Sequence, residues 1–204
     1  MSIDHVEVLV EEPSMEAALE LLLPKILGEV TFTIHPHQGK EHLLGTLPSK
    51  LQGYAGWLPE SFRIVVVIDR DSDDCKELKK RLDAYASSAR KLITPPAKRK
   101  DFVVVNRIVI EELEAWYFGD WEAVREAYPR VGATIPANAR YRHPDEILGG
   151  TWEAFERILK RAGYHQQGLR KIEAARDVAA RMEPARNTSP SFVAFRDALT
   201  AMVP

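Results

Sequence analysis

The chain has 204 residues, with 28 Lys and Arg against 30 Asp and Glu, 45% hydrophobic residues and one cysteine, Cys75. This length suits one large domain with a substantial buried core, which argues against a disordered chain. A lone cysteine excludes an internal disulfide and a zinc site built from thiolates, and no apolar run approaches the ~20 residues that cross a bilayer. We therefore expect a cytoplasmic protein without a membrane partner.

Charge is uneven along the chain although its sum is only −2. Residues 1–75 carry a net charge of −8, whereas residues 76–150 and residues 151–204 each carry +3. An acidic first third favours a site for a cation, and a basic remainder suits the binding of a phosphate backbone. Ordinary scatter of surface charge is an equal alternative at this point.

Two units of strand and helix open the chain. Residues 6–10 form an apolar run that predicts a buried strand, and apolar residues recur at helical spacing from the N-cap candidate Ser14 towards Gly28. Residues 30–34 alternate β-branched and aromatic side chains, which predicts a second strand. A helical pattern follows Gly39-Lys40.

The strongest strand signal lies in residues 63–68. Its continuous β-branched run is typical of a central parallel strand that is covered on both faces, and it ends at Asp69. A helical pattern follows, and then a basic, proline-rich connection over residues 90–100. Residues 102–110 predict one long or broken strand.

From residue 121 onward the pattern is helical and more basic. Helices are expected near residues 121–128, 151–162, 169–183 and 191–202. Strands that alternate with helices, followed by helices only, predict an α/β fold with an open, mostly parallel sheet and a helical C-terminal subregion. We place the core in residues 1–118 and the subregion, packed on it, in residues 119–204, together forming one structural domain.

Acidic residues follow three of the predicted strands. They are Glu11 and Glu12, Asp69 and Asp71, and Glu111, Glu112 and Glu114. The carboxyl ends of parallel strands share one edge of the sheet, so we expect these side chains to converge. Carboxylates that converge repel one another unless a cation neutralises them, and hard oxygen ligands favour Mg²⁺ or Mn²⁺ over Zn²⁺. The spacing of Asp69 and Asp71 lets both face one site, although acidic pairs also fill many ordinary turns.

These segments resemble known families. Val8 to Glu11 and Val65 to Asp71 together resemble the Toprim fold of topoisomerases, primases and overcoming-lysogenization-defect nucleases. Over nearly its whole length the chain resembles the bacterial family called domain of unknown function 4276. The segments that carry this second resemblance are Gly39-Lys40, Asp69 to Asp73, Glu112 to Trp116 and Asn187 to Phe192.

The resemblance implies a role for each acidic group. Glu11 matches the Toprim glutamate of general acid/base or metal chemistry. The Toprim metal-binding pair is matched by Asp69 and Asp71. Glu112 and Glu114 resemble the additional acidic ligands of the nuclease branch, and we favour Glu114 as the ligand. Toprim domains often have glycine after the glutamate, whereas this chain has Glu12, which would narrow the approach of a phosphate.

Basic and polar residues complete the expected site. Lys40 follows Gly39 at a predicted helix start, where an ammonium and free amides would hold a phosphate, so we give it a catalytic role against the alternative of a solvated lysine. We also expect contacts to substrate phosphate from three residues of the C-terminal region: Lys171, Arg186 and Ser189. The structural alternative for the last segment is that Ser191 is the N-cap of the final helix.

The resemblance implies a nuclease or phosphoryl-transfer domain that acts on nucleic-acid phosphodiesters with Mg²⁺ or Mn²⁺. It also implies an ATPase partner of the ABC or SMC kind in a defence or DNA-processing system. The alternative is a catalytically silent regulatory or assembly subunit that binds a nucleotide or the partner ATPase. Glu12 and the modest basic charge favour this alternative.

Overall fold

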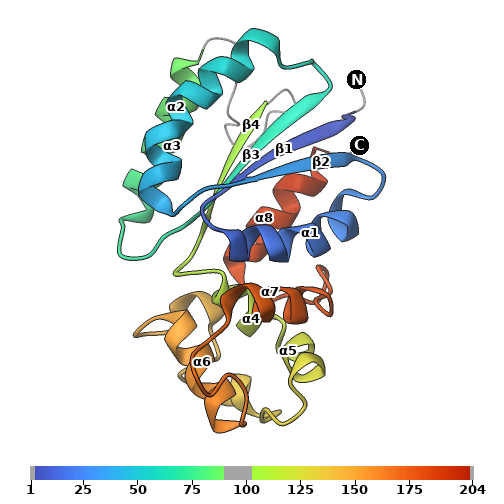
Figure 1. Ribbon diagram of the computed structural model, residues 1–204, viewed down its shortest axis with the longest axis vertical. Helices are drawn as coiled ribbons and strands as arrows, with labels where there is room; N and C mark the ends of the chain where they lie inside the picture. Colours follow the sequence, from blue (N-terminus) through green and yellow to red (C-terminus); the bar gives the residue numbers. More distant parts are fainter. Residues whose placement is uncertain (1–2, 90–102, 203–204) are drawn as a thin grey trace.

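The computed structural model describes residues 3–89 and 103–202 as an α/β fold (Figure 1). Within these residues the strands are β1 His5–Val10, β2 Thr31–Pro36, β3 Phe62–Asp69 and β4 Val104–Val109. Between them lie the helices α1 Pro13–Leu27, α2 Lys40–Trp57 and α3 Cys75–Ser88. After β4 come α4 Glu114–Gly119, α5 Trp121–Ala127, the 3₁₀ helices η1 Ile135–Ala137 and η2 Pro144–Glu146, α6 Thr151–Arg161, α7 Lys171–Ala179 and α8 Pro190–Thr200.

The strands form one open sheet in the order β2-β1-β3-β4, and every neighbouring pair is parallel. The predicted α/β class with an open parallel sheet is confirmed, and the arrangement is consistent with a Toprim-like fold. Figure 1 shows α2 and α3 on one face of the sheet, with α1 and α8 on the other. Because helices cover both faces, β1 and β3 are buried along most of their length, which explains their continuous apolar runs.

Two helix starts differ from those predicted. The N-cap of α1 is Glu12 and its first residue is Pro13, because the missing amide of proline is harmless in the first helical turn. Ser14 is therefore not the N-cap, and its hydroxyl donates a hydrogen bond to the Glu12 carboxylate. The last helix likewise starts with a proline that follows Ser189, so Ser191 is not its N-cap.

Other boundaries are shorter than expected. β4 is a single strand, so the break considered within residues 102–110 is absent from its described part. α7 covers only the middle of the helix predicted over residues 169–183. The basic connection over residues 90–100 lies outside the described residues.

The helices after β4 return to the core. α7 packs along α1, and α8 packs against both β4 and α1. Figure 1 shows α4, α5 and α6 below the sheet, with α7 between them and α1. In the part of the chain described here, no helix is long and apolar enough to cross a membrane.

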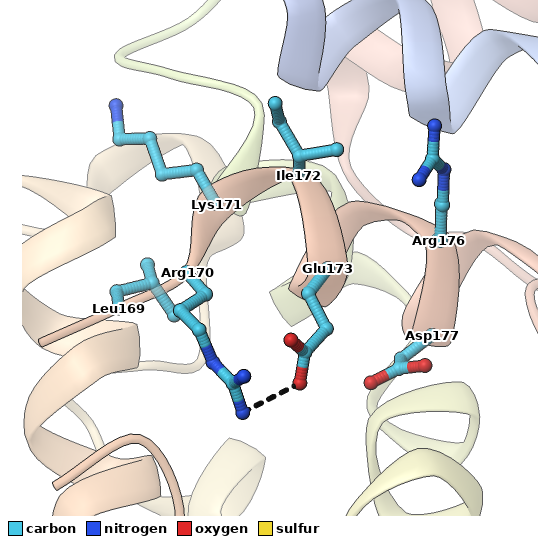
Figure 2. A pocket seen from close by; sticks show the side chains of 7 residues that line it. All are labelled: Leu169, Arg170, Lys171, Ile172, Glu173, Arg176 and Asp177. Atoms are coloured by element: carbon cyan, nitrogen blue, oxygen red, sulfur yellow. Dashed lines mark ion pairs between the residues drawn. The ribbon is translucent and has the colours of Figure 1, made fainter.

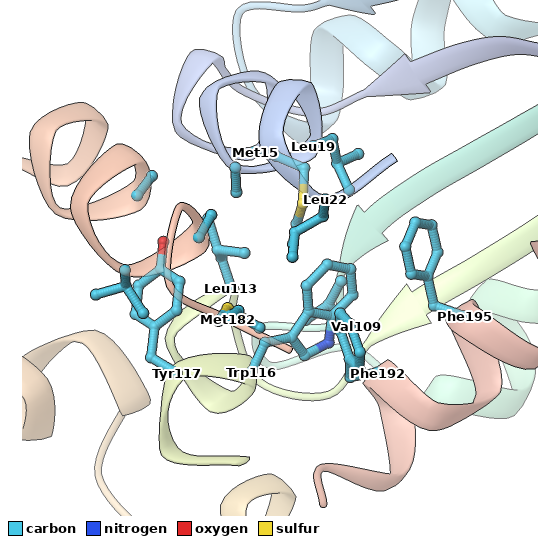
Figure 3. Packing of buried hydrophobic residues seen from close by; sticks show 14 of the residues in the cluster. Met15, Leu19, Leu22, Val109, Leu113, Trp116, Tyr117, Met182, Phe192 and Phe195 are labelled. Atoms are coloured by element: carbon cyan, nitrogen blue, oxygen red, sulfur yellow. The ribbon is translucent and has the colours of Figure 1, made fainter. Parts of the chain in front are cut away.

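Buried aromatic side chains join this C-terminal region to the sheet. The Trp116 ring stacks on Phe195 with a centroid distance of 5.0 Å and meets Phe192 edge-on at 5.1 Å (Figure 3). The indole Nε1 of Trp116 donates a hydrogen bond to Ser191 Oγ at 3.2 Å. One hydrophobic cluster contains these rings together with the side chains of β1, β3 and α1. The core therefore continues across the proposed boundary near residue 118.

This shared core predicts that both regions unfold together. Replacing the fully buried Phe195 with alanine should lower the free energy of unfolding by about 3–5 kcal/mol, because it removes the ring on which Trp116 stacks. Urea unfolding followed by tryptophan fluorescence and by circular dichroism should show one coincident transition. Val193→Ala, at a half-buried position of the same helix, is the matched control and should lose far less. Two separate transitions in the native chain would contradict a shared core.

Candidate functional site

Carboxylates from three strand ends gather at the carboxyl edge of the sheet, as the sequence predicted. Glu11 follows β1, Asp69 ends β3, and Glu114 opens α4 after β4. Glu11 Oε2 accepts a hydrogen bond from the Asp69 backbone amide at 3.2 Å, which ties the two central strands together at this edge. The negative charges of Glu11 and Glu114 both act on Asp69, so side chains that are distant in the sequence are neighbours here.

We define the acid cluster as Glu11, Glu12, Asp69, Asp71 and Glu114. Within it, the pKa of Asp69 is strongly perturbed. Burial raises the pKa of Asp69 well above its ordinary value, and the charges of Glu11 and Glu114 raise it further. Its Oδ1 atom is buried and has no hydrogen-bond partner among the described residues. A buried oxygen without a partner loses its hydration, so this atom favours a bound proton or cation.

The pKa values of Glu11 and Glu114 are also raised. Burial, followed by the charge of Asp71, raises the pKa of Glu11 to about 7, although the Asp69 amide and Lys40 act in the opposite direction. Burial also raises the pKa of Glu114 to about 7, with partial compensation by Lys171. Both carboxyl groups therefore titrate near neutral pH rather than near pH 4.5.

Lys40 supplies positive charge at one side of the cluster. Gly39, whose φ of 92° suits glycine, precedes it, and the Gly39 amide donates to the Glu11 carbonyl at 3.0 Å. The Lys40 Nζ atom lies 2.6 Å from Asp71 Oδ2 and 2.9 Å from Asp73 Oδ2. Lys40 is thus not the solvated lysine that sequence left open, since it neutralises the loop after β3.

The loop that carries Asp71 has an unusual backbone. Asp71 and Glu111 have φ angles of 49° and 60°, in the left-handed region that non-glycine residues seldom adopt. The Asp71 amide donates to the Glu111 carbonyl at 3.1 Å, and the Arg70 guanidinium forms an ion pair with the Glu111 carboxylate. Such backbone strain collects at functional sites, and the charge of Asp71 in this loop acts on Glu11.

Lys171 supplies positive charge at the other side. It begins α7, where Figure 2 shows its side chain extending away from the ion pair of Arg170 and Glu173 along a surface pocket. Its Nζ atom lies 3.8 Å from Glu12 Oε1 and 5.6 Å from the centre of the Trp152 ring.

Burial lowers the pKa of Lys171, yet the charges of several acids outweigh burial and raise the pKa overall. These acids are Glu114, Glu12, Glu112 and Asp69. Glu12 therefore belongs to the cluster, as its place among the strand-end acids predicted, although it also departs from the Toprim pattern.

Glu112 has a structural task. Its Oε2 atom accepts hydrogen bonds from the Thr151 amide at 3.1 Å, the Thr151 hydroxyl at 3.0 Å and the Trp152 amide at 3.0 Å. The carboxylate thereby caps the start of α6 and favours that helix end electrostatically. Glu114, without such a cap to make, is the better candidate for a metal ligand, as the sequence favoured.

Arg186 and Ser189 also make internal contacts. Arg186 Nε lies 2.7 Å from Asp120 Oδ1, and the Asp120 side chain is fully buried. The Ser189 hydroxyl donates to Asp145 Oδ1 at 2.6 Å. Among the contacts of the described residues, none joins Arg186 or Ser189 to the acid cluster, and their expected phosphate contacts stay predictions.

A divalent cation such as Mg²⁺ requires several oxygen donors placed around one point. Over residues 3–89 and 103–202, no group of three or more His, Cys, Asp or Glu side chains is arranged so that it could hold a metal ion. The donor types nevertheless fit Mg²⁺ or Mn²⁺, because carboxylate oxygens converge and the Oδ1 atom of Asp69 lacks a partner. The ammonium groups of Lys40 and Lys171 lie beside carboxylates of the cluster, where they offset negative charge.

Comparison with known proteins identifies the family. The model of a family described as Domain of unknown function (DUF4276) matches residues 10–200, so the chain belongs to this family. The resemblance seen in the sequence is confirmed in this respect. No curated protein and no solved structure gives a significant match.

The raised pKa values predict how stability depends on pH without metal. Between about pH 4.5 and 7 the folded chain holds protons on Glu11 and Glu114 that the unfolded chain has released, so stability falls as pH rises through this window. We expect a loss of several kcal/mol in the presence of a chelator, at about 1.4 kcal/mol for each unit of pKa shift. Thermal melts at pH 5, 6, 7 and 8 would measure it.

Glu114→Gln should flatten this pH dependence and raise the melting temperature at pH 8. Glu20→Gln, on an exposed part of α1, is the matched control and should keep the native slope. A native chain whose melting temperature rises steadily from pH 5 to 8 would contradict the buried, like-charged cluster.

Proposed function

We propose that this member of the DUF4276 family is a Mg²⁺- or Mn²⁺-dependent phosphoryl-transfer domain that hydrolyses nucleic-acid phosphodiesters. One observation carries the proposal: buried Asp69 has an unpartnered oxygen and lies under the charges of Glu11 and Glu114. Like charges in this arrangement favour a bound cation over an empty site at neutral pH.

Glu11, Asp69, Asp71 and Glu114 would hold the cation, and Glu112 would add only the oxygen that does not cap α6. A bound Mg²⁺ or Mn²⁺ activates water and stabilises charge on the phosphate and on the leaving oxygen. Glu11 is the carboxylate that we assign to accept a proton from water.

The two lysines are the proposed contacts for substrate phosphate. In the metal-free chain Lys40 is paired with Asp71 and Asp73, and Lys171 lies near Glu12. A cation held by the carboxylates would reduce this attraction, which would free both ammonium groups for phosphate oxygens. Lys40 pairs with Asp71 and Lys171 lies near Glu12, so the two ammonium groups would offer separate contacts to a chain of phosphates.

The partner and the setting follow from the family resemblance rather than from contacts of this chain. We propose nucleic acid as substrate, an ATPase of the ABC or SMC kind as partner, and a cytoplasmic defence or DNA-processing system as the setting. The net charge of +3 on each of residues 76–150 and 151–204 is compatible with a polyanionic substrate.

A catalytically silent regulatory or assembly subunit is the second candidate. The observation that favours it is that Lys40 already neutralises Asp71 and Asp73, and its Nζ atom also donates to the Arg70 carbonyl at 2.9 Å. Positive charges of the protein alone can therefore neutralise carboxylates at the carboxyl edge of the sheet. Metal binding and cleavage must be measured separately to decide between the two candidates.

Metal binding should appear as stabilisation. Saturating Mn²⁺ should raise the melting temperature of the native chain, because a ligand at 100 times its Kd adds about 2.7 kcal/mol. Asp69→Asn should abolish this gain and should melt higher than the native chain without metal, since it removes a buried charge. Asp197→Asn, on the exposed side of α8, is the control and should keep the gain. An equal gain in the Asp69 variant would exclude this site.

Cleavage is the second measurement. With Mn²⁺, the native chain should cut plasmid or single-stranded DNA, whereas Glu11→Ala and Asp69→Ala should lose at least about 100-fold of the rate, in line with the loss of a general base. Asp197→Asn again serves as the control. Stabilisation by Mn²⁺ without cleavage of either substrate would favour the regulatory candidate, and equal cleavage by all variants would show that the activity comes from elsewhere.

A further inference from the structure

Tyr117 is a buried residue whose hydroxyl the proposed reaction does not use. It lies on α4 three residues after Glu114, so the two side chains share one side of the helix. Its ring packs against Phe155 with a centroid distance of 5.3 Å, and 1% of the residue is exposed. Figure 3 shows Tyr117 apart from Trp116 and Phe192, with Leu113 and Met182 between them, and with its hydroxyl at the end of the ring that is far from the α4 backbone.

The hydroxyl of Tyr117 has no hydrogen-bond partner among the described residues. A tyrosine buried in an apolar core usually finds a partner for its O–H group, because an unmade hydrogen bond is destabilising. Phenylalanine would fill the same space between Phe155 and its neighbours without this penalty. Packing alone therefore does not account for the hydroxyl.

The surroundings of this hydroxyl are acidic. The carboxylates that act on it electrostatically are, in decreasing order, those of Glu114, Asp69 and Glu12. The Oδ1 atom of Asp69 is a buried acceptor without a partner, so a free donor and a free acceptor both belong to this region. Two complementary buried atoms that lack partners indicate a place that changes when a ligand binds.

We propose that Tyr117 is a positioning residue of the acid cluster: its hydroxyl donates to the Glu114 carboxylate when the cluster holds a divalent cation. This inference rests on the proposed function and adds a residue that the sequence resemblance does not include. A donor behind a ligating carboxylate fixes its orientation, and the loss of such a partner typically weakens metal affinity 10- to 100-fold. The hydroxyl is neutral, so it adds no competing charge beside Lys171.

The test compares Mn²⁺ affinity with stability in the full chain. Calorimetric titration should show that Tyr117→Phe binds Mn²⁺ about tenfold more weakly than the native chain. Without metal, the same variant should melt at an equal or higher temperature, because it loses a buried hydroxyl that has no partner. A weaker site in a protein that is no less stable separates positioning from simple damage to the core.

Tyr128→Phe is the matched control. The Tyr128 hydroxyl donates to Asp177 at 3.2 Å and also lies 3.1 Å from His165 Nε2, so its removal should lower the melting temperature and leave Mn²⁺ affinity unchanged. Native Mn²⁺ affinity in Tyr117→Phe would overturn the inference and leave the proposed function intact. A lower metal-free melting temperature in Tyr117→Phe would also overturn it, since the hydroxyl would then have a structural task. A native chain that binds no Mn²⁺ overturns both.

Discussion

Mutual repulsion among carboxylates at one edge of a parallel sheet is the constraint on which the rest of this structure depends. Parallel strands must end on the same side, so acids placed after β1, β3 and β4 are brought together whatever their separation in the sequence. The fold tolerates this because burial, together with neighbouring negative charge, raises the pKa of Glu11 and Glu114 to about 7, so that both groups hold protons up to near neutral pH, and because two lysines lie beside the cluster.

The C-terminal helices place a positive charge near the acid cluster. α7 presents Lys171 to the cluster, and it is held against α1 by contacts that include the Lys25 ammonium, which donates to the Met182 carbonyl at 2.7 Å. The segment before α8 closes over α4, where a side chain on Gly119 would collide with Asn187 and Ser189. The subregion is therefore a source of positive charge for the site as well as a cover for the sheet.

The sequence predicts features that depend on neighbouring residues better than contacts that depend on tertiary packing. The β-branched run before Asp69 identifies a central strand, and a strand end identifies where its acids lie, so the convergence of Glu11, Asp69 and Glu114 could be predicted without a structure, and their role as metal ligands stays a prediction. The resemblance favoured Glu114 over Glu112, but the cap that Glu112 forms could not be predicted, because its partners at Thr151 and Trp152 come from a helix that begins far along the chain. The contacts of Arg186 and Ser189 depend on tertiary packing in the same way.

Tyr117 illustrates the opposite case, in which sequence points to a sound but incomplete interpretation. An aromatic residue at helical spacing predicts a core position, and the ring is indeed buried against Phe155. Only the three-dimensional arrangement reveals that its hydroxyl lies under the charges of Glu114 and Asp69 without a partner. A core that retains a destabilising hydroxyl beside an acid cluster is economically explained by a ligand that the hydroxyl helps to hold, because packing by itself would favour phenylalanine.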